Sequence, residues 1–139
     1  MPTKTKSIRV PDDLLREIDA ELQRCGTAEW SAGVIELLHE AISMRRAPGI
    51  VFADSPSGRR AVLAGTGLEV WEIVSTWLAA DREPDRLRQA YDWLTEPQIR
   101  AALAYYDLYP AEVDARIARE THWTVDRVGT DIPSTSSLS

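Results

Sequence analysis

The sequence has 139 residues, of which 44% are hydrophobic and 27% charged, and its formal charge is -6. That composition can bury a core, which excludes a disordered chain and a fibre, and the length suits one domain or two small ones. No run of about 18 apolar residues occurs and the amino terminus is polar, so we expect neither a spanning helix nor a secretory signal, and a cytoplasmic protein. With one cysteine and two histidines, we expect no disulfide, no metal site and no cofactor.

The charge is distributed unevenly along the chain. Residues 1–60 carry nine basic and nine acidic side chains, whereas residues 61–139 carry seven basic and thirteen acidic ones. The first ten residues hold Lys4, Lys6 and Arg9 and no acid. The negative total therefore does not exclude a nucleic-acid partner for the amino-terminal part.

Helix-stop signals divide the chain near residue 47. Arg45 and Arg46 close a helical pattern, and Pro48-Gly49 follows. The expected organisation is a first domain at residues 1–47, a second at 48–123 and a Ser/Thr-rich tail at 124–139. The expected fold class is mainly α.

The first segment predicts one strand and two helices. In residues 5–10 the apolar Ile8 and Val10 alternate with polar residues, which is the period of a strand with one buried face. Acids follow Pro11 and open a helix of about residues 12–24, with Gly26 as its carboxyl cap. Ser31 is expected to cap a second helix whose wide apolar stripe consists of Val34, Ile35, Leu37, Leu38, Ala41 and Ile42.

About 45 residues with a lone strand cannot bury enough surface to be stable alone, and the strand lacks a partner. A homodimer solves both problems, because two copies can pair their strands antiparallel and cover each other's second helix. Such a two-stranded ribbon fits the major groove of DNA.

This segment resembles the ribbon-helix-helix repressors of the MetJ/Arc/CopG class. The resemblance is carried by residues 6–15, by Ile18-Asp19, and by the helix opened at Ser31. It implies that Thr5, Ser7 and Arg9 contact DNA bases. It implies phosphate contacts by Lys4 and Lys6 and by the amino end of the second helix, namely Trp30, Ser31 and Ala32. It also implies a dimer interface formed by apolar side chains, namely Ile8, Val10, Val34, Ile35 and Leu38.

Two positions depart from that class. Lys6 stands where an apolar residue is common, and the stretch before Ser31 has no basic residue. Glu29 would repel a phosphate unless its side chain points away.

The second segment predicts a small hairpin followed by helices, a winged-helix-like arrangement. Strands are expected at 50–52 and 60–63, and helices at about 69–80, 84–92 and 95–107. Thr95 and Gln98 form a capping box with Pro97 near the helix start, and Pro110 opens a last helix that ends near His122-Trp123. Gly65-Thr66-Gly67 lacks the further residues of a nucleotide-binding loop.

Residues 49–120 resemble a bacterial antitoxin-like domain family, long of unknown function and related to VapB-type antitoxins. The Ala64-Gly65-Thr66 turn and the Leu94-Thr95 helix start carry much of this resemblance, although Gly67 stands where the family commonly has Arg. The helix of about 95–107 exposes Glu96, Gln98, Arg100 and Asp107, which do not form a cationic face, so we expect this domain to pack and dimerise rather than read bases. Trp71 and Trp77 are expected in its core, and Trp123 is a candidate anchor for a toxin.

The sequence therefore predicts a dimeric repressor that binds operator DNA and, by the resemblance, neutralises a toxin, with a PIN-domain ribonuclease as the expected partner. Larger homo-oligomers stay open, and no membrane association is expected. No nucleophile–base pair, carboxylate dyad or metal cluster is recognisable, so we expect no catalytic residues and no enzyme. Two alternatives remain: an oligomerising interaction module without DNA binding, and a ribbon-helix-helix repressor that senses a small ligand.

Overall fold

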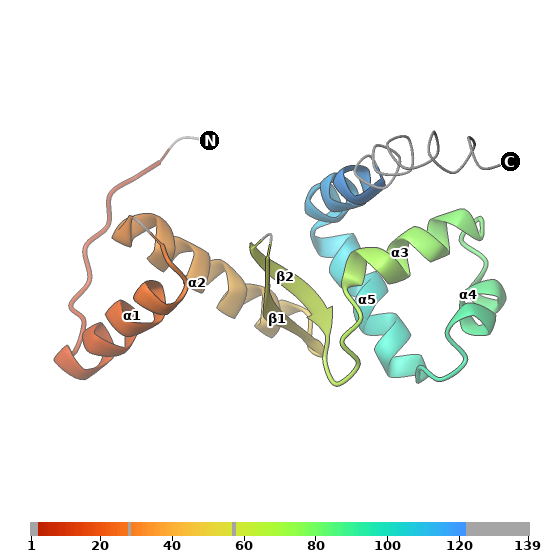
Figure 1. Ribbon diagram of the computed structural model, residues 1–139, viewed down its shortest axis with the longest axis horizontal. Coiled ribbons are helices and arrows are strands. Elements are labelled where there is room, and N and C mark those ends of the chain that lie inside the picture. Colours follow the sequence, from red (N-terminus) through yellow and green to blue (C-terminus); the bar gives the residue numbers. More distant parts are fainter. Residues whose placement is uncertain (1–2, 28, 57, 122–139) are drawn as a thin grey trace, which may run out of the picture. The chain divides into compact units, whose positions relative to one another are not determined.

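The protein is mainly helical with one two-stranded hairpin, as the sequence predicts (Figure 1). The computed structural model describes residues 3–27, 29–56 and 58–121. The chain divides into two compact units, Met1–Ile42 and Ser43–Ser139, which are described separately below. Within the described residues no helix is both long and apolar enough to cross a membrane.

Helix α1 spans Asp12–Arg24, the predicted range. Asp12 and Asp13 lie in its first turn, where carboxylates interact favourably with the helix dipole. Its carboxyl end is a Schellman motif: the Gly26 amide donates to the Gln23 carbonyl and the Thr27 amide to the Leu22 carbonyl. Gly26 has a φ of 71°, a conformation that glycine adopts without the steric cost of a Cβ, so its predicted capping role is confirmed.

Helix α2 spans Trp30–Arg46, so Ser31 lies inside its first turn rather than before it. The prediction that Ser31 caps it is wrong. Glu29 precedes the helix, and its carboxylate accepts a hydrogen bond from the Ala32 amide at 3.3 Å, while its carbonyl accepts one from Gly33 at 3.1 Å. The Glu29 carboxylate thus accepts from the Ala32 amide, the bond that the hydroxyl of a capping serine at position 29 would otherwise make.

The strand predicted at residues 5–10 is absent from the single chain: residues 3–11 form neither helix nor strand. A strand needs a partner for its backbone amides and carbonyls, and the described part of one chain provides none. The intermolecular ribbon therefore stays a prediction.

Helices α1 and α2 meet at the turn between them. A Cβ on Gly33 would lie 2.6 Å from Leu22 Cδ2 and 2.9 Å from Thr27 Cγ2, so a larger residue there would require these side chains to shift. The Trp30 indole N–H donates across the turn to Asp19 at 2.8 Å. Among the described residues of this unit, Leu22 and Gly33 are the buried ones.

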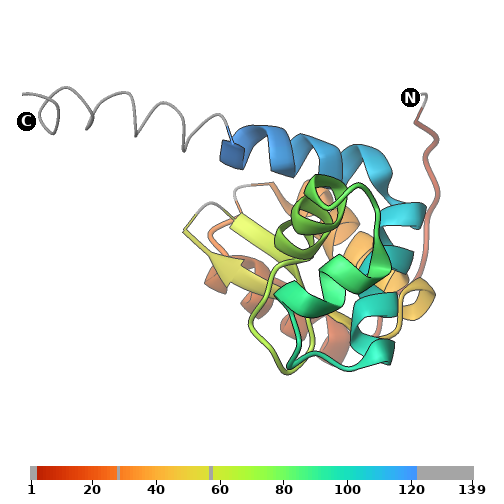
Figure 2. The same ribbon diagram turned by 90° about the vertical axis from the view of Figure 1, so that its right-hand side faces the viewer.

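The second unit opens with the predicted hairpin. Strand β1 (Ile50–Ser55) pairs antiparallel with β2 (Gly58–Leu63), with Ile50 opposite Leu63 and Ser55 opposite Gly58. Helices follow at Val70–Ala79 (α3), Pro84–Ala90 (α4) and Glu96–Leu108 (α5), and residues 110–121 are also helical (Figure 2). These elements confirm the predicted hairpin and helices. The predicted end of the last helix, near His122-Trp123, lies outside the described residues.

A single apolar core holds this unit together. Helix α3 packs on both α4 and α5, and the hairpin packs on α3 and α5. Trp71 and Trp77 pack against the core from α3, which confirms their predicted place. The buried members are Ala47, Ile50, Leu63, Val70, Ile73, Val74, Leu87, Leu94, Ile99, Ala102, Tyr105 and Val113.

Candidate functional site

The residues that the sequence assigns to DNA lie on the amino-terminal segment and are accessible. Thr5, Ser7 and Arg9 are exposed, as are Lys4 and Lys6. Ile8 is 79% exposed, which is high for a large apolar side chain, and Val10 is partly covered. An extended backbone would place Ile8 and Val10 on one face and the three predicted base-contacting residues on the other.

The start of α2 differs from the predicted phosphate site in one respect. Trp30, Ser31 and Ala32 are exposed there, but the Ala32 amide already donates to the Glu29 carboxylate. A phosphate bound at this helix end would have to displace that carboxylate, whose charge would otherwise repel it.

The apolar residues predicted for the dimer interface are largely uncovered. Ile35 and Leu38 on α2 are 55% and 54% exposed, and Val34 beside them is partly covered. Other large apolar side chains of the first unit are also exposed, namely Leu14 and Leu15 on α1 and Ile42 on α2. The helices of this unit thus present apolar surface that no described residue of the unit covers.

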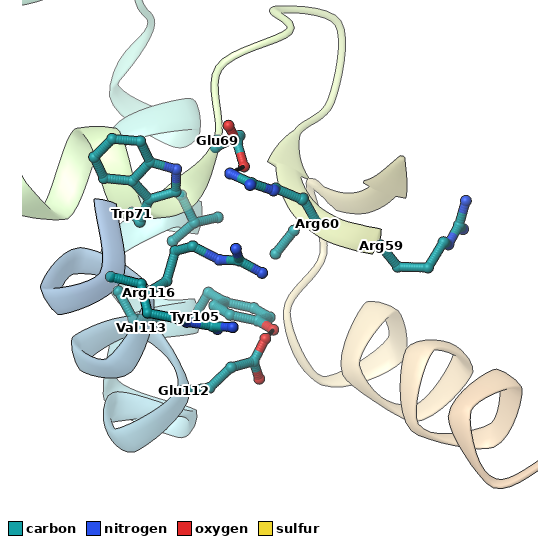
Figure 3. Close-up of a pocket in the computed structure, with 11 residues that line it drawn as sticks. Arg59, Arg60, Glu69, Trp71, Tyr105, Glu112, Val113 and Arg116 are labelled. Carbon is teal, nitrogen blue, oxygen red and sulfur yellow. Dashed lines mark hydrogen bonds and ion pairs between the residues drawn. The ribbon is translucent and has the colours of Figure 1, made fainter. Parts of the chain in front are cut away.

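The second unit contains an arginine-lined pocket that sequence reasoning missed. Four arginines line it: Arg59 and Arg60 on β2, and Arg116 and Arg119 on the helix of residues 110–121 (Figure 3). The Arg60 guanidinium bonds the carboxylates of Glu69 at 2.8 Å and Glu120 at 2.9 Å. The sequence shows that Arg116 and Arg119, three residues apart, share one face of a helix. It does not show that these two arginines lie near Arg59 and Arg60, because that depends on the fold.

No group of metal-ligating side chains occurs within the described ranges, 3–27, 29–56 and 58–121. Trp123, the candidate anchor for a toxin, lies outside them.

Comparison with known proteins identifies part of the second unit. Residues 50–106 match a protein family described as "Protein of unknown function (DUF433)". This match covers the hairpin, α3, α4 and nearly all of α5, and it confirms the expected resemblance to a family of unknown function over that range. The relation to antitoxins does not form part of that description. No curated protein and no solved structure matches the chain.

Proposed function

We propose that the chain is a dimeric DNA-binding repressor of the ribbon-helix-helix kind that serves as the antitoxin of a toxin–antitoxin operon. The observation that supports the DNA-binding part is how few residues of the first unit are buried. It has two helices and a basic amino-terminal segment, yet Leu22 and Gly33 are the buried residues among those described.

A second copy of the chain is the partner that fits this unit. Burying one Leu or Ile side chain contributes about 1.5–3 kcal/mol, and a two-fold interface would cover each exposed residue in both copies. Such an interface would cover the exposed Ile35 and Leu38 on α2 or the exposed Leu14 and Leu15 on α1. Because a unit of this size cannot bury enough surface alone, dimerisation and folding of the first unit are coupled.

The dimer also gives residues 5–10 a strand partner. When two copies pair antiparallel, Ile8 and Val10 turn to the helices, and Thr5, Ser7 and Arg9 face outward. A two-stranded ribbon enters the major groove of DNA, where Arg9 can donate two hydrogen bonds to a guanine. Lys4 and Lys6 add positive charge next to the phosphates.

The antitoxin part rests on the resemblance of the second unit and on its charge. Residues 61–139 carry the net charge of -6. On α5 the exposed Glu96 pairs with Arg88, and Arg100 and Asp107 are both exposed, so this helix presents no excess of cations to a DNA backbone. An acidic unit suits a basic protein partner, and a PIN-domain ribonuclease is the proposed one.

The DNA-binding part is tested with a labelled duplex that covers the DNA upstream of this chain's own gene. The wild-type chain is expected to bind it at two chains per site in the presence of excess unrelated DNA. For Arg9→Ala, a lost bidentate base contact costs about 1–3 kcal/mol and occurs twice per dimer, so we expect at least tenfold weaker binding.

Sedimentation should show the Arg9→Ala chain to be as dimeric as the wild type, since Arg9 belongs to the DNA-facing side. Arg86→Ala is the matched control, because Arg86 is an exposed arginine of the second unit, and its affinity should equal the wild-type value. Equal affinity of Arg9→Ala and wild type would favour the interaction module over the repressor.

The antitoxin part has a separate test. Co-expression with the product of the adjacent gene should yield a stable complex and relieve the growth defect that this product causes alone. If the two proteins do not co-purify, the antitoxin role is contradicted and the repressor role is unaffected.

A further inference from the structure

The second unit holds a recessed pocket lined by four arginines and two glutamates. It is bounded by β2, the start of α3, α5 and the helix of residues 110–121, and has a volume of about 360 Å³ with its open mouth included. Arg60 reaches it from β2 and Arg116 from the helix of residues 110–121, on whose side Trp71 and Val113 also lie (Figure 3). This combination offers hydrogen-bond donors beside an apolar wall.

The carboxylates near the pocket already have partners. Glu69 and Glu120 both bond Arg60, whose side chain is 13% exposed. Glu112 accepts the hydroxyl of Tyr105 at 2.8 Å. None of these three acids forms a hydrogen bond with Arg116 in the part of the chain that the structure describes.

Arg116 is a mostly buried arginine with which these acids form no hydrogen bond. Its side chain is 18% exposed, and its nearest carboxylate is Glu120 at 3.8 Å, which Arg60 already binds at 2.9 Å. In the part of the chain that the structure describes, the Arg116 guanidinium makes no hydrogen bond. Burial, together with the nearby charges of Arg60 and Arg119, lowers the pKa of Arg116. A mostly buried guanidinium without acceptors is costly unless an anion joins it.

Trp71 adds a second unsatisfied donor to the same pocket wall. Its indole Nε1 is buried and has no hydrogen-bond acceptor among the described residues. In Figure 3 the indole nitrogen is on the side of the ring that faces the arginines. A ligand in the pocket does not reach this buried nitrogen, so the donors without acceptors that an oxyanion can bind there are those of Arg116.

We propose that this pocket binds a small organic oxyanion, a carboxylate or phosphate attached to a compact apolar group, through Arg116 and Arg119. The apolar group lies against Trp71 and Val113. The recessed position of Arg60 and Arg116 favours a small ligand over duplex DNA, because a DNA backbone contacts side chains at the exposed surface. The assignment is independent of the proposed repressor function.

Two probes distinguish the carboxylate from the phosphate: benzoate and phenyl phosphate, each titrated into the full chain in chloride buffer without phosphate. At least one should bind saturably in calorimetry, raise the thermal unfolding temperature and shift the ¹⁵N–¹H signal of the Trp71 indole. The indole signal is assigned by its disappearance in Trp71→Phe.

Arg116→Met keeps the length of the side chain and removes its charge. We expect at least tenfold weaker binding of the probe and, without any probe, an unfolding temperature equal to or above that of the wild type, because no hydrogen bond is lost. A purely structural arginine would give the opposite change in the unfolding temperature. Arg119→Ala, at an exposed position, should also weaken binding, while Arg86→Met serves as the charge-matched control and should bind as wild type does.

The proposal is overturned if neither probe binds at millimolar concentration, or if Arg116→Met and Arg119→Ala both bind the probe as the wild type does. It is also overturned if duplex DNA shifts the Trp71 indole signal, neither small anion does so, and the Arg116→Met substitution abolishes the effect of the DNA. Binding of one probe, lost in Arg116→Met and retained in Arg86→Met, establishes the site and the class of its ligand.

Discussion

Glu29 is the residue that sets the chain apart from the expected pattern at the start of α2. Its carboxylate accepts from the Ala32 amide, where the ribbon-helix-helix resemblance implies a DNA phosphate. A helix amino end attracts either anion, and the two cannot occupy one amide together. The same carboxylate thus caps α2 and, in the proposed complex, would compete with a DNA phosphate for the Ala32 amide.

Replacing this carboxylate should therefore change stability and DNA affinity in opposite directions. Glu29→Ala is expected to lower the free energy of unfolding by about 0.5–2 kcal/mol, because the helix loses its cap. Affinity for the upstream duplex should rise several-fold, since the Ala32 amide becomes available and a negative charge is removed. Urea unfolding at one protein concentration and fluorescence anisotropy measure the two effects.

Glu36→Ala is the matched control for this change. Glu36 is an exposed acid on the same helix, so its removal alters the net charge equally without touching the amino end. If both variants gain the same affinity, long-range charge explains the result and the amino end of α2 does not contact phosphate.

The cap of α5 shows where local sequence determines an element. Thr95 accepts a hydrogen bond from the Gln98 amide at 3.3 Å, and its own amide donates to Gln98 Oε1 at 2.8 Å, which confirms the predicted capping box. Each partner is within three residues of the other, so the sequence alone contains the whole motif.

Thr95→Ala should therefore destabilise the second unit by about 1 kcal/mol, measured as a lower urea midpoint with an unchanged m-value. Thr95→Ser keeps the hydroxyl and should retain most of the stability. Equal loss in both variants would mean that the Thr95 methyl group, rather than the cap, stabilises α5.

Other elements were predictable to the degree that their signals are local. The apolar periodicity of α1 and its Gly26 cap fix both ends of that helix, and the hairpin follows from two short apolar runs around a turn. The start of α2 was misplaced because Ser31 is the stronger cap by residue type, whereas the longer Glu29 side chain reaches the same turn. Residues 5–10 form no strand in the single chain, because a strand there would need a partner that the described part of one chain does not supply.

The arginine pocket could not be predicted for a different reason. Arg60 and Arg116 are far apart in the sequence and meet because β2 and the helix of residues 110–121 pack into one unit. Taken one at a time, each arginine resembles a solvated surface residue. Their shared burial, and the absence of a hydrogen bond to Arg116 in the described part of the chain, emerge only from the fold.

At the scale of the whole molecule, the two units contrast in how complete they are. The second unit buries a continuous core in which Ile73, Val74 and Ala102 have no exposed surface. The first exposes its apolar helix faces and the Ile8 side chain. A negative total charge is compatible with DNA binding in such a molecule, because the acidic excess belongs to residues 61–139 and the first ten residues carry none.

The central claim is that a second copy of the chain completes the first unit through an intermolecular ribbon. Hydrogen exchange of the amides of residues 5–10, measured by NMR on the full chain, tests it most directly. In an antiparallel two-stranded pair every second amide of a strand is hydrogen-bonded, so we predict alternating protection, with the bonded amides exchanging roughly a hundredfold or more slowly than an unstructured chain. Exchange of all these amides at the rates of an unstructured chain, at a concentration where sedimentation shows a dimer, would contradict the ribbon.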